Sequence, residues 1–250
     1  MSLYTDDRAV RNIIGLTLTF SIIIVSVGLT ATLGYQQLDD VSQAERVENA
    51  RAGFEGVAGS LERLQQQRSV VATNELDLAG GSLTVTNGTT MTLRSTENFN
   101  RTVSTGGLRY RIGDASFTYE AGALFRTDSR GNSVMIAQPT MSCTSDRAVI
   151  SVVRVEPEAS SQFAGEVVSV SATAQTSELM YPLNRTGQDS AGDAEEANIT
   201  VGSPRSRAWE RYFETTGNWT QSSSLPDTYV CDAVDAVYVR RTNVSIDFQG

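Results

Sequence analysis

Few side chains of this protein are suited to catalysis or metal binding, because the chain contains neither histidine nor lysine. Its 250 residues include 20 basic residues, all of them arginine, and 29 acidic residues. Without histidine, a Ser-His-Asp triad and histidine-ligated metal sites are excluded. Without lysine, the phosphate-binding loop G-x-x-x-x-G-K is excluded as well. We therefore predict no catalytic residue, no cofactor and no metal ligand, and we expect a protein that is not an enzyme.

One group of acidic residues has the oxygen ligands that calcium prefers, namely Asp189, Asp193, Glu195 and Glu196. Their spacing does not match that of an EF-hand loop. The sequence therefore favours a solvated acidic loop over a calcium site.

The two cysteines, Cys143 and Cys231, are the only thiols in the sequence. Their wide separation fits no zinc-binding or redox motif. In an oxidising compartment they can form a single disulfide that closes a long loop, which is worth about 4 kcal/mol in the chain-entropy model. The alternative is a pair of buried free thiols, and we predict the disulfide.

Asparagine side chains are the second candidates for covalent chemistry, because N-x-S/T sequons are acceptors for N-glycosylation. The alternative is that a chain rich in serine and threonine produces such triplets freely. We expect Asn87 and Asn198 to be the best acceptors because each is predicted in a loop or at its edge, and Asn243 to be the poorest because it falls inside a strand. The predicted acceptors are Asn87, Asn100, Asn184, Asn198, Asn218 and Asn243.

The charge balance indicates an acidic protein adapted to salt. The net charge is −9 and the pI is near 4.6. In strong salt the Debye length falls to about 3 Å, so the mutual repulsion of acidic groups costs little. Arginine in place of every lysine is a further resemblance to proteins of salt-loving archaea, although a GC-rich genome also favours arginine. No basic face is evident, so we expect no nucleic-acid partner.

The residues from Ile13 to Leu33 form an uncharged apolar stretch without proline. About 20 apolar residues match the ~30 Å hydrocarbon core of a bilayer, so this stretch predicts a transmembrane helix. Arg8 and Arg11 precede it, while acidic residues follow it, which predicts a single-pass protein with a cytoplasmic N-terminus and an extracellular C-terminal domain. The alternative is a secretory signal peptide cleaved near Ala31.

Beyond the apolar stretch, the period of the hydrophobic residues predicts an amphipathic helix from Tyr35 to about Val71. Apolar residues recur every seven positions, each followed by another apolar residue three positions later, and together they form a stripe along one face. We favour packing of this face against the globular part of the same chain over a free coiled coil. The stripe consists of Val47, Ala50, Phe54, Val57, Leu61 and Leu64.

From about Thr73 the period changes from helical to alternating, which predicts strands. Asn87-Gly88 is a strong hairpin signal, a second break falls at Ala121-Gly122, and a short helix is expected around Trp209. The predicted fold is α+β, with an N-terminal transmembrane helix that continues into a long amphipathic helix and a C-terminal antiparallel β-rich head. The predicted boundaries are a cytoplasmic leader at 1–12, the transmembrane helix at 13–35, the amphipathic stalk helix at 36–75 and the extracellular β-rich domain at 76–250.

The segment Arg8-Ala9-Val10-Arg11-Asn12-Ile13-Ile14-Gly15, which runs into the apolar stretch, resembles the start of haloarchaeal type IV pilin-like proteins. In that family a peptidase cuts just before the hydrophobic helix, and this helix then packs in the core of a filament. By position, the resemblance implies cleavage between Ala9 and Val10. Arg11-Asn12 stands where the family has a Ser-Pro pair.

The resemblance implies a pilin-like fold and a non-enzymatic, membrane-anchored cell-surface glycoprotein that acts as a minor pilin or as a component of surface adhesion. The implied partners are the membrane and other pilin-like subunits or a pilus secretion platform. The alternative function is a single-pass membrane protein whose extracellular head binds a ligand without assembling into filaments.

Overall fold

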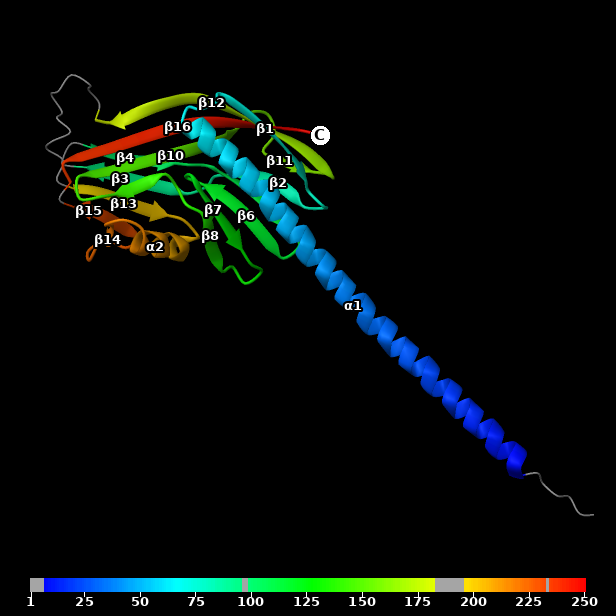
Figure 1. The fold of residues 1–250 in the computed structure, drawn as a ribbon. Coiled ribbons are helices and arrows are strands. Elements are labelled where there is room, and N and C mark those ends of the chain that lie inside the picture. The colour runs from blue at the N-terminus through cyan, green and yellow to red at the C-terminus, as the bar shows by residue number, and fades with distance from the viewer. Residues whose placement is uncertain (1–6, 96–98, 183–195, 233) are drawn as a thin grey trace, which may run out of the picture. The chain divides into compact units, whose positions relative to one another are not determined.

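The computed structural model describes residues 7–95, 99–182, 196–232 and 234–250, and within these ranges it leaves out the side chains of residues 7–14 and 31–40. The chain divides into two compact units, residues 1–46 and residues 47–250, and each is described by itself. Figure 1 shows the elements and their labels.

Helix α1 extends from Asp7 to Gln65 and contributes to both units. It ends where Gln67 takes a positive φ of 57°, a left-handed residue just beyond the helix. There the backbone NH of Gln67 donates to the carbonyl oxygen of Leu64 at 3.0 Å, and that of Arg68 donates to Arg63 at 2.9 Å. These hydrogen bonds satisfy carbonyl groups that a helix end otherwise leaves without partners.

The first of three sheets in residues 47–250 has the strand order β1-β12-β16-β10-β9 (Figure 1). In β16 the buried side chains alternate with more exposed ones, and the buried face changes along the strand. Val237 and Val239 belong to one hydrophobic core, whereas Val244 belongs to another. The strands are β1 (Val71–Asp77), β12 (Val167–Tyr181), β16 (Ala236–Gln249), β10 (Arg147–Pro157) and β9 (Met141–Cys143).

The second sheet has the order β11-β2-β5-β6-β7-β8. Its β6–β7 hairpin turns at Ala121 and Gly122, whose φ angles are 52° and 93°. Positive φ at both central residues is the backbone that a tight two-residue hairpin requires. The strands are β11 (Gln162–Ala164), β2 (Ser82–Thr86), β5 (Gly107–Ile112), β6 (Ala115–Glu120), β7 (Ala123–Thr127) and β8 (Ser133–Ala137).

The third sheet has the order β14-β15-β13-β3-β4 and is accompanied by helix α2 (Ser206–Thr215). The predicted hairpin at Asn87-Gly88 is wrong, because β2 pairs with β5 while β3 pairs with β4 and β13. This turn instead carries the chain from the second sheet to the third. The strands are β14 (Thr220–Gln221), β15 (Thr228–Asp232), β13 (Glu196–Gly202), β3 (Thr90–Ser95) and β4 (Phe99–Ser104).

Two hydrophobic cores hold these layers together. One core lies between the C-terminal part of α1 and the first and second sheets, and it includes Phe54, Leu61 and Leu64. The ring of Phe54 lies 6.0 Å from that of Tyr110 in β5. The other core joins the third sheet and α2 to parts of the first and second sheets.

The predicted transmembrane helix is wrong. Among the residues that the structure describes, no helix combines the length and the apolar character needed to cross a membrane. The predicted localisation is therefore also wrong, namely a single-pass membrane protein with a cytoplasmic N-terminus and an extracellular C-terminal domain.

The predicted fold class is also wrong, because strands predominate in the described part of the chain and no long amphipathic helix there leads into a separate head. The apolar face from Ala50 to Leu64 is buried in the core of residues 47–250, so this part of α1 is a core element rather than a stalk. The helix ends at Gln65, and strand β1 already occupies residues 71–77. The sheets are not wholly antiparallel either, because β10 and β16 pair in parallel.

The buried face of α1 can be tested by truncating its side chains. Phe54 and Leu61 are both 0% exposed, so replacing either by alanine should leave a cavity and lower the free energy of unfolding by about 2–5 kcal/mol. Urea denaturation with the disulfide intact measures the loss. Leu225→Ala is the control, because Leu225 is 45% exposed and should change the value by less than about 0.5 kcal/mol. Equal effects at the three positions would contradict this packing.

Candidate functional sites

The disulfide between Cys143 and Cys231 is present, as the sequence predicted. Cys143 ends the edge strand β9 of the first sheet, and Cys231 lies in β15 of the third sheet. Their Cα atoms are 5.8 Å apart, and both residues are buried. The bond therefore ties two sheets together inside the core and is not placed for exchange with solvent thiols.

The disulfide shares a hydrophobic core with several aromatic side chains, most of them from α2 and the turn that follows it. The ring of Phe213 stacks on that of Tyr229 with the centroids 4.2 Å apart, and Trp219 meets Phe213 edge-on at 5.3 Å. The hydroxyl of Tyr212 donates to the carbonyl oxygen of Met141 at 2.9 Å, and burial raises the pKa of Tyr212 to about 12. These rings pack as a structural core and leave no reactive group exposed.

A buried polar cluster joins the β6–β7 turn to the start of α2. Glu120 is fully buried and pairs with Arg205, whose side chain is 7% exposed. Its carboxylate also accepts hydrogen bonds from the hydroxyl of Ser203 at 2.8 Å and the indole NH of Trp209 at 3.0 Å. The guanidinium of Arg205 lies 5.7 Å from the centroid of the Phe125 ring. Both carboxylate oxygens therefore have donors within the protein.

The charge state of Glu120 follows from this cluster. Burial by itself would raise the pKa of the carboxyl group, but the hydrogen bond and charge of Arg205, with the hydrogen bond from Trp209, hold the pKa below its ordinary value. Glu120 is thus a buried carboxylate that stays ionised at neutral pH and is closed to solvent. The sequence does not reveal this cluster, because Glu120 and Arg205 are far apart in the chain and no local pattern marks either one.

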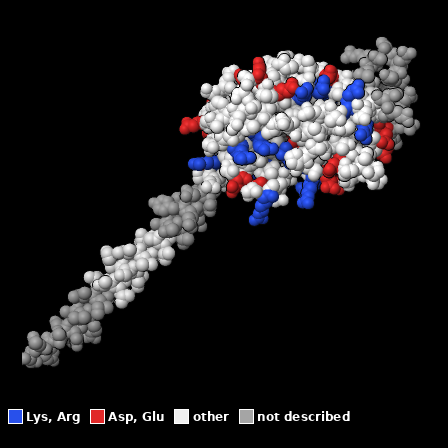
Figure 2. Space-filling view, turned by 180° about the vertical axis from the view of Figure 1, so that it is seen from behind, with Lys and Arg blue, Asp and Glu red and all other residues white. Residues whose placement is uncertain are grey.

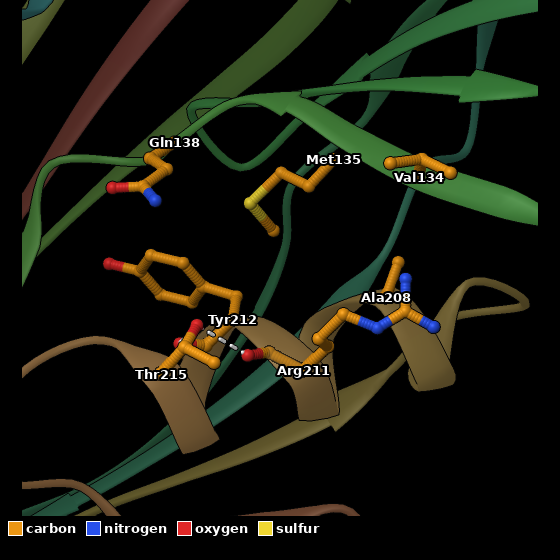
Figure 3. Close-up of a pocket in the computed structure, with 7 residues that line it drawn as sticks. All are labelled: Val134, Met135, Gln138, Ala208, Arg211, Tyr212 and Thr215. Atoms are coloured by element: carbon orange, nitrogen blue, oxygen red, sulfur yellow. Dashed lines mark hydrogen bonds between the residues drawn. The ribbon is translucent and has the colours of Figure 1, made fainter.

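A small cavity of about 120 Å³ lies between strand β8 and helix α2 (Figure 3). The figure shows Met135 and Gln138 extending towards the ring of Tyr212 across this space, with Arg211 on the α2 side. The hydroxyl of Thr215 donates to the carbonyl oxygen of Arg211 at 2.7 Å. The cavity is lined by polar side chains, among them Arg211 and Gln138, as well as by apolar ones, and its volume is below the ~300 Å³ at which ligand pockets begin.

A larger cavity of about 360 Å³, here called the junction cavity, lies where the three sheets meet. Its walls come from the end of β2, the turn between β4 and β5, and the end of β10. The lining residues that carry polar side chains are Thr86, Asn87, Ser104, Arg154, Glu156 and Ser161.

The predicted glycosylation acceptors occupy different environments. Asn87, Asn100 and Asn218 are exposed. Asn198 lies in β13 between β15 and β3, and Asn243 lies in β16, so both side chains are half-buried inside sheets. The sequence predicted Asn198 in a loop or at the edge of one, and the structure places it third in strand β13.

Two further sets of predicted residues are only partly described. Asn184 and the acidic residues 189, 193 and 195 lie outside the described residues, while Glu196 is exposed at the start of β13. Ala9 and Val10 lie within the backbone of α1.

The described apolar part of α1, residues 15–30, is a candidate interaction surface. Its large side chains are between 52% and 73% exposed. Figure 2 shows no charged side chain on this part, whereas arginine and acidic side chains lie interspersed on the visible face of the other unit. The large apolar residues are Leu16, Leu18, Phe20, Ile22, Ile23, Ile24, Val25, Val27 and Leu29.

The hydroxyl groups of this segment are bonded to its own backbone. Thr19 donates to the carbonyl oxygen of Gly15 at 2.9 Å, Ser21 to that of Thr17 at 2.8 Å and Thr30 to that of Ser26 at 2.8 Å. Hydroxyls that are bonded within the helix do not need water as a partner. The surface that they present is therefore compatible with apolar surroundings.

The chain belongs to the family of unknown function DUF7289, whose sequence model matches residues 8–247. No curated protein and no solved structure matches the chain. The match covers both α1 and the three sheets, so the family includes the apolar helix as well as the β-rich unit.

The disulfide should stabilise the β-rich unit mainly by restricting the unfolded chain. Replacing both cysteines by alanine is expected to lower the free energy of unfolding by about 4 kcal/mol, because the sequence separation is 88 residues. Chemical denaturation of the double variant measures this loss, and wild-type protein that is unfolded and refolded in the presence of a reductant should show a similar one. A variant as stable as the oxidised protein would contradict the role assigned to the bond.

The Glu120 cluster predicts a specific pH dependence. Because the pKa of Glu120 is lower in the folded than in the unfolded state, its contribution is fully present above the unfolded value of about 4.5 and is lost as the pH falls through the folded value. Glu120→Gln should cost about 3–5 kcal/mol near pH 7, since Arg205 stays buried without its counter-charge.

The pH dependence of unfolding provides the measurement, with Asp146→Asn in the exposed pair with Arg147 as the control. The difference in stability between wild type and Glu120→Gln should shrink as the pH falls below the unfolded value of about 4.5, and the control should stay close to wild type at neutral pH. A difference that does not vary with pH would contradict ionisation of Glu120.

Proposed function

We propose that the protein is a non-enzymatic, pilin-like subunit of a cell-surface filament or adhesion structure. In this proposal residues 15–30 of α1 pack against the same segment of other copies. The observation that carries the proposal is the exposure of every large apolar side chain in this segment.

The distribution of these side chains around the helix favours several neighbours. The run Ile22-Ile23-Ile24-Val25 places an apolar group on every side, because successive residues are ~100° apart around the axis. A helix that is apolar all round is typically buried in the core of a larger assembly. Contact with one partner would cover only one side, so a bundle of like helices fits this segment better than a simple dimer.

The remaining features of the segment suit close packing. Gly15 and Gly28 have no neighbouring heavy atom near the position of a Cβ, so other helices can approach closely there. The hydroxyls of Thr19, Ser21 and Thr30 bring no unsatisfied donors into the bundle, because each already donates to the helix backbone. Dispersion between closely spaced apolar groups would then supply the attraction.

The β-rich unit would form the exterior of such an assembly. Its disulfide supports a location outside the reducing cytoplasm. The net charge of −9 keeps exposed units soluble in strong salt. The resemblance to pilins further implies processing between Ala9 and Val10 and delivery by a secretion platform. N-terminal sequencing tests the processing, and a mature chain that begins at Val10 would support it.

The proposal is tested by the assembly of the full chain, followed by sedimentation and electron microscopy. Ile23→Asp should reduce the sedimenting fraction by about tenfold or more, because a desolvated carboxylate in an apolar bundle costs several kcal/mol. Val134→Asp is a matched control, because Ile23 and Val134 are each 52% exposed and Val134 lies in β8. A wild-type chain that stays monomeric, or two variants that assemble equally, would contradict the proposal.

A further inference from the structure

We propose that the junction cavity is a saccharide-binding site, filled by the first sugars of a glycan attached to Asn87. This inference goes beyond the proposed function and does not depend on filament assembly. It rests on the chemistry of the cavity and on the position of one sequon at its rim.

The cavity is built from all three sheets. Thr86 ends strand β2, and Asn87 follows it. Ser104 ends β4, and Gly106 lies in the turn after it. Arg154 lies in β10. Backbone hydrogen bonds fix these walls to one another. The NH of Val155 donates to Thr105 at 2.7 Å, and the NH of Val85 donates to Ser161 at 2.7 Å.

The size and the lining of the cavity fit a sugar. Its volume of about 360 Å³ lies in the lower part of the ~300–1,000 Å³ range of ligand sites. Arg154 and Glu156, which form an ion pair at 2.6 Å, offer a planar donor and a carboxylate acceptor to neighbouring hydroxyls. Val85 and Pro157 supply apolar surface for the CH groups of a ring. A polyol uses both kinds of surface, whereas a lipid chain would leave the charged pair desolvated.

Asn87 is held at the rim while its amide remains accessible. The hydroxyl of Ser104 donates to the carbonyl oxygen of Asn87 at 3.3 Å. Gly88 has a φ of 66°, and a Cβ there would lie only 1.9 Å from the carbonyl oxygen of Gly106, so this turn is pinned against the next one. A glycan on Asn87 would therefore start from a fixed point beside the cavity.

Because the glycan is covalently attached to Asn87, it can occupy the cavity even if its affinity for the cavity is modest. A ligand linked to its own site binds at an effective concentration in the millimolar range for a short linker. Sugars bound by a few hydrogen bonds can then occupy the cavity without free ligand. Asn100 and Asn218 are exposed sequons as well, but neither lines the junction cavity or the cavity beside α2. Asn100 is thus a matched control for glycosylation away from a cavity.

The first experiment uses the full chain purified from its native cells. Mass spectrometry of glycopeptides should find Asn87 modified. Asn87→Gln should then lower the melting temperature by about 2–4 °C, the shift expected for roughly 1 kcal/mol in a domain of this size. In an Arg154→Ala background the same substitution should have little effect, because the contacts of the glycan are already lost. Asn100→Gln should show no such dependence on Arg154.

The second experiment separates a tethered from a free sugar. Full chain made in cells without N-glycosylation is titrated with glucose and with N-acetylglucosamine, and NMR reports resonances that shift in wild type but not in Arg154→Ala. Coupling between Asn87→Gln and Arg154→Ala supports the proposal as stated. If the free sugars bind but Asn87 is not modified, the cavity is still a saccharide-binding site. That result contradicts the part of the proposal in which a glycan on Asn87 fills it. If neither the coupling nor the binding of free sugars is observed, the proposal is overturned.

Discussion

The parallel pairing of β10 with β16 is the constraint on which the β-rich unit depends. The two strands run side by side from Arg147 opposite Ala236 to Pro157 opposite Ile246. Along β10, Ile150 and Val152 enter the core shared with the third sheet, while Val153 and Val155 enter the core shared with α1. One strand therefore contributes to both cores, and loss of its pairing would uncover both. Parallel strands buried in this way read as nearly continuous apolar runs.

The third sheet and α2 are joined to the other sheets by a disulfide and an ion pair, which differ from the backbone pairing of β10 with β16. The third sheet and α2 are tied to the rest by the disulfide and by the Glu120–Arg205 pair. Both links lie in the core, where a covalent bond and a buried, hydrogen-bonded ion pair hold a definite geometry that apolar packing alone would leave less specific. The carboxylate of Glu120 and the guanidinium of Arg205 thus serve to orient α2, and neither reaches a surface where chemistry could occur.

The two units of the chain satisfy the hydrophobic effect in different ways. Residues 47–250 bury their large apolar side chains in cores of their own, including the face of α1 from Ala50 to Leu64. In residues 15–30 the large apolar side chains are instead exposed. A contiguous exposed apolar surface of this kind marks an interaction site, because leaving it in water costs free energy roughly in proportion to its area. The inferred function rests on this difference.

Local signals in the sequence determined several elements of the protein. The seven-residue stripe marked the buried face of α1, the alternation of apolar residues marked strands such as β16, and the absence of histidine excluded whole classes of site. The sequence also indicated the Cys143–Cys231 bond. Only the tertiary structure decided that Asn87-Gly88 crosses between sheets, that β10 pairs in parallel, and that Glu120 meets Arg205. Each of these depends on contacts between residues far apart in the chain, and such contacts are chosen by the packing of whole layers rather than by local conformational preference.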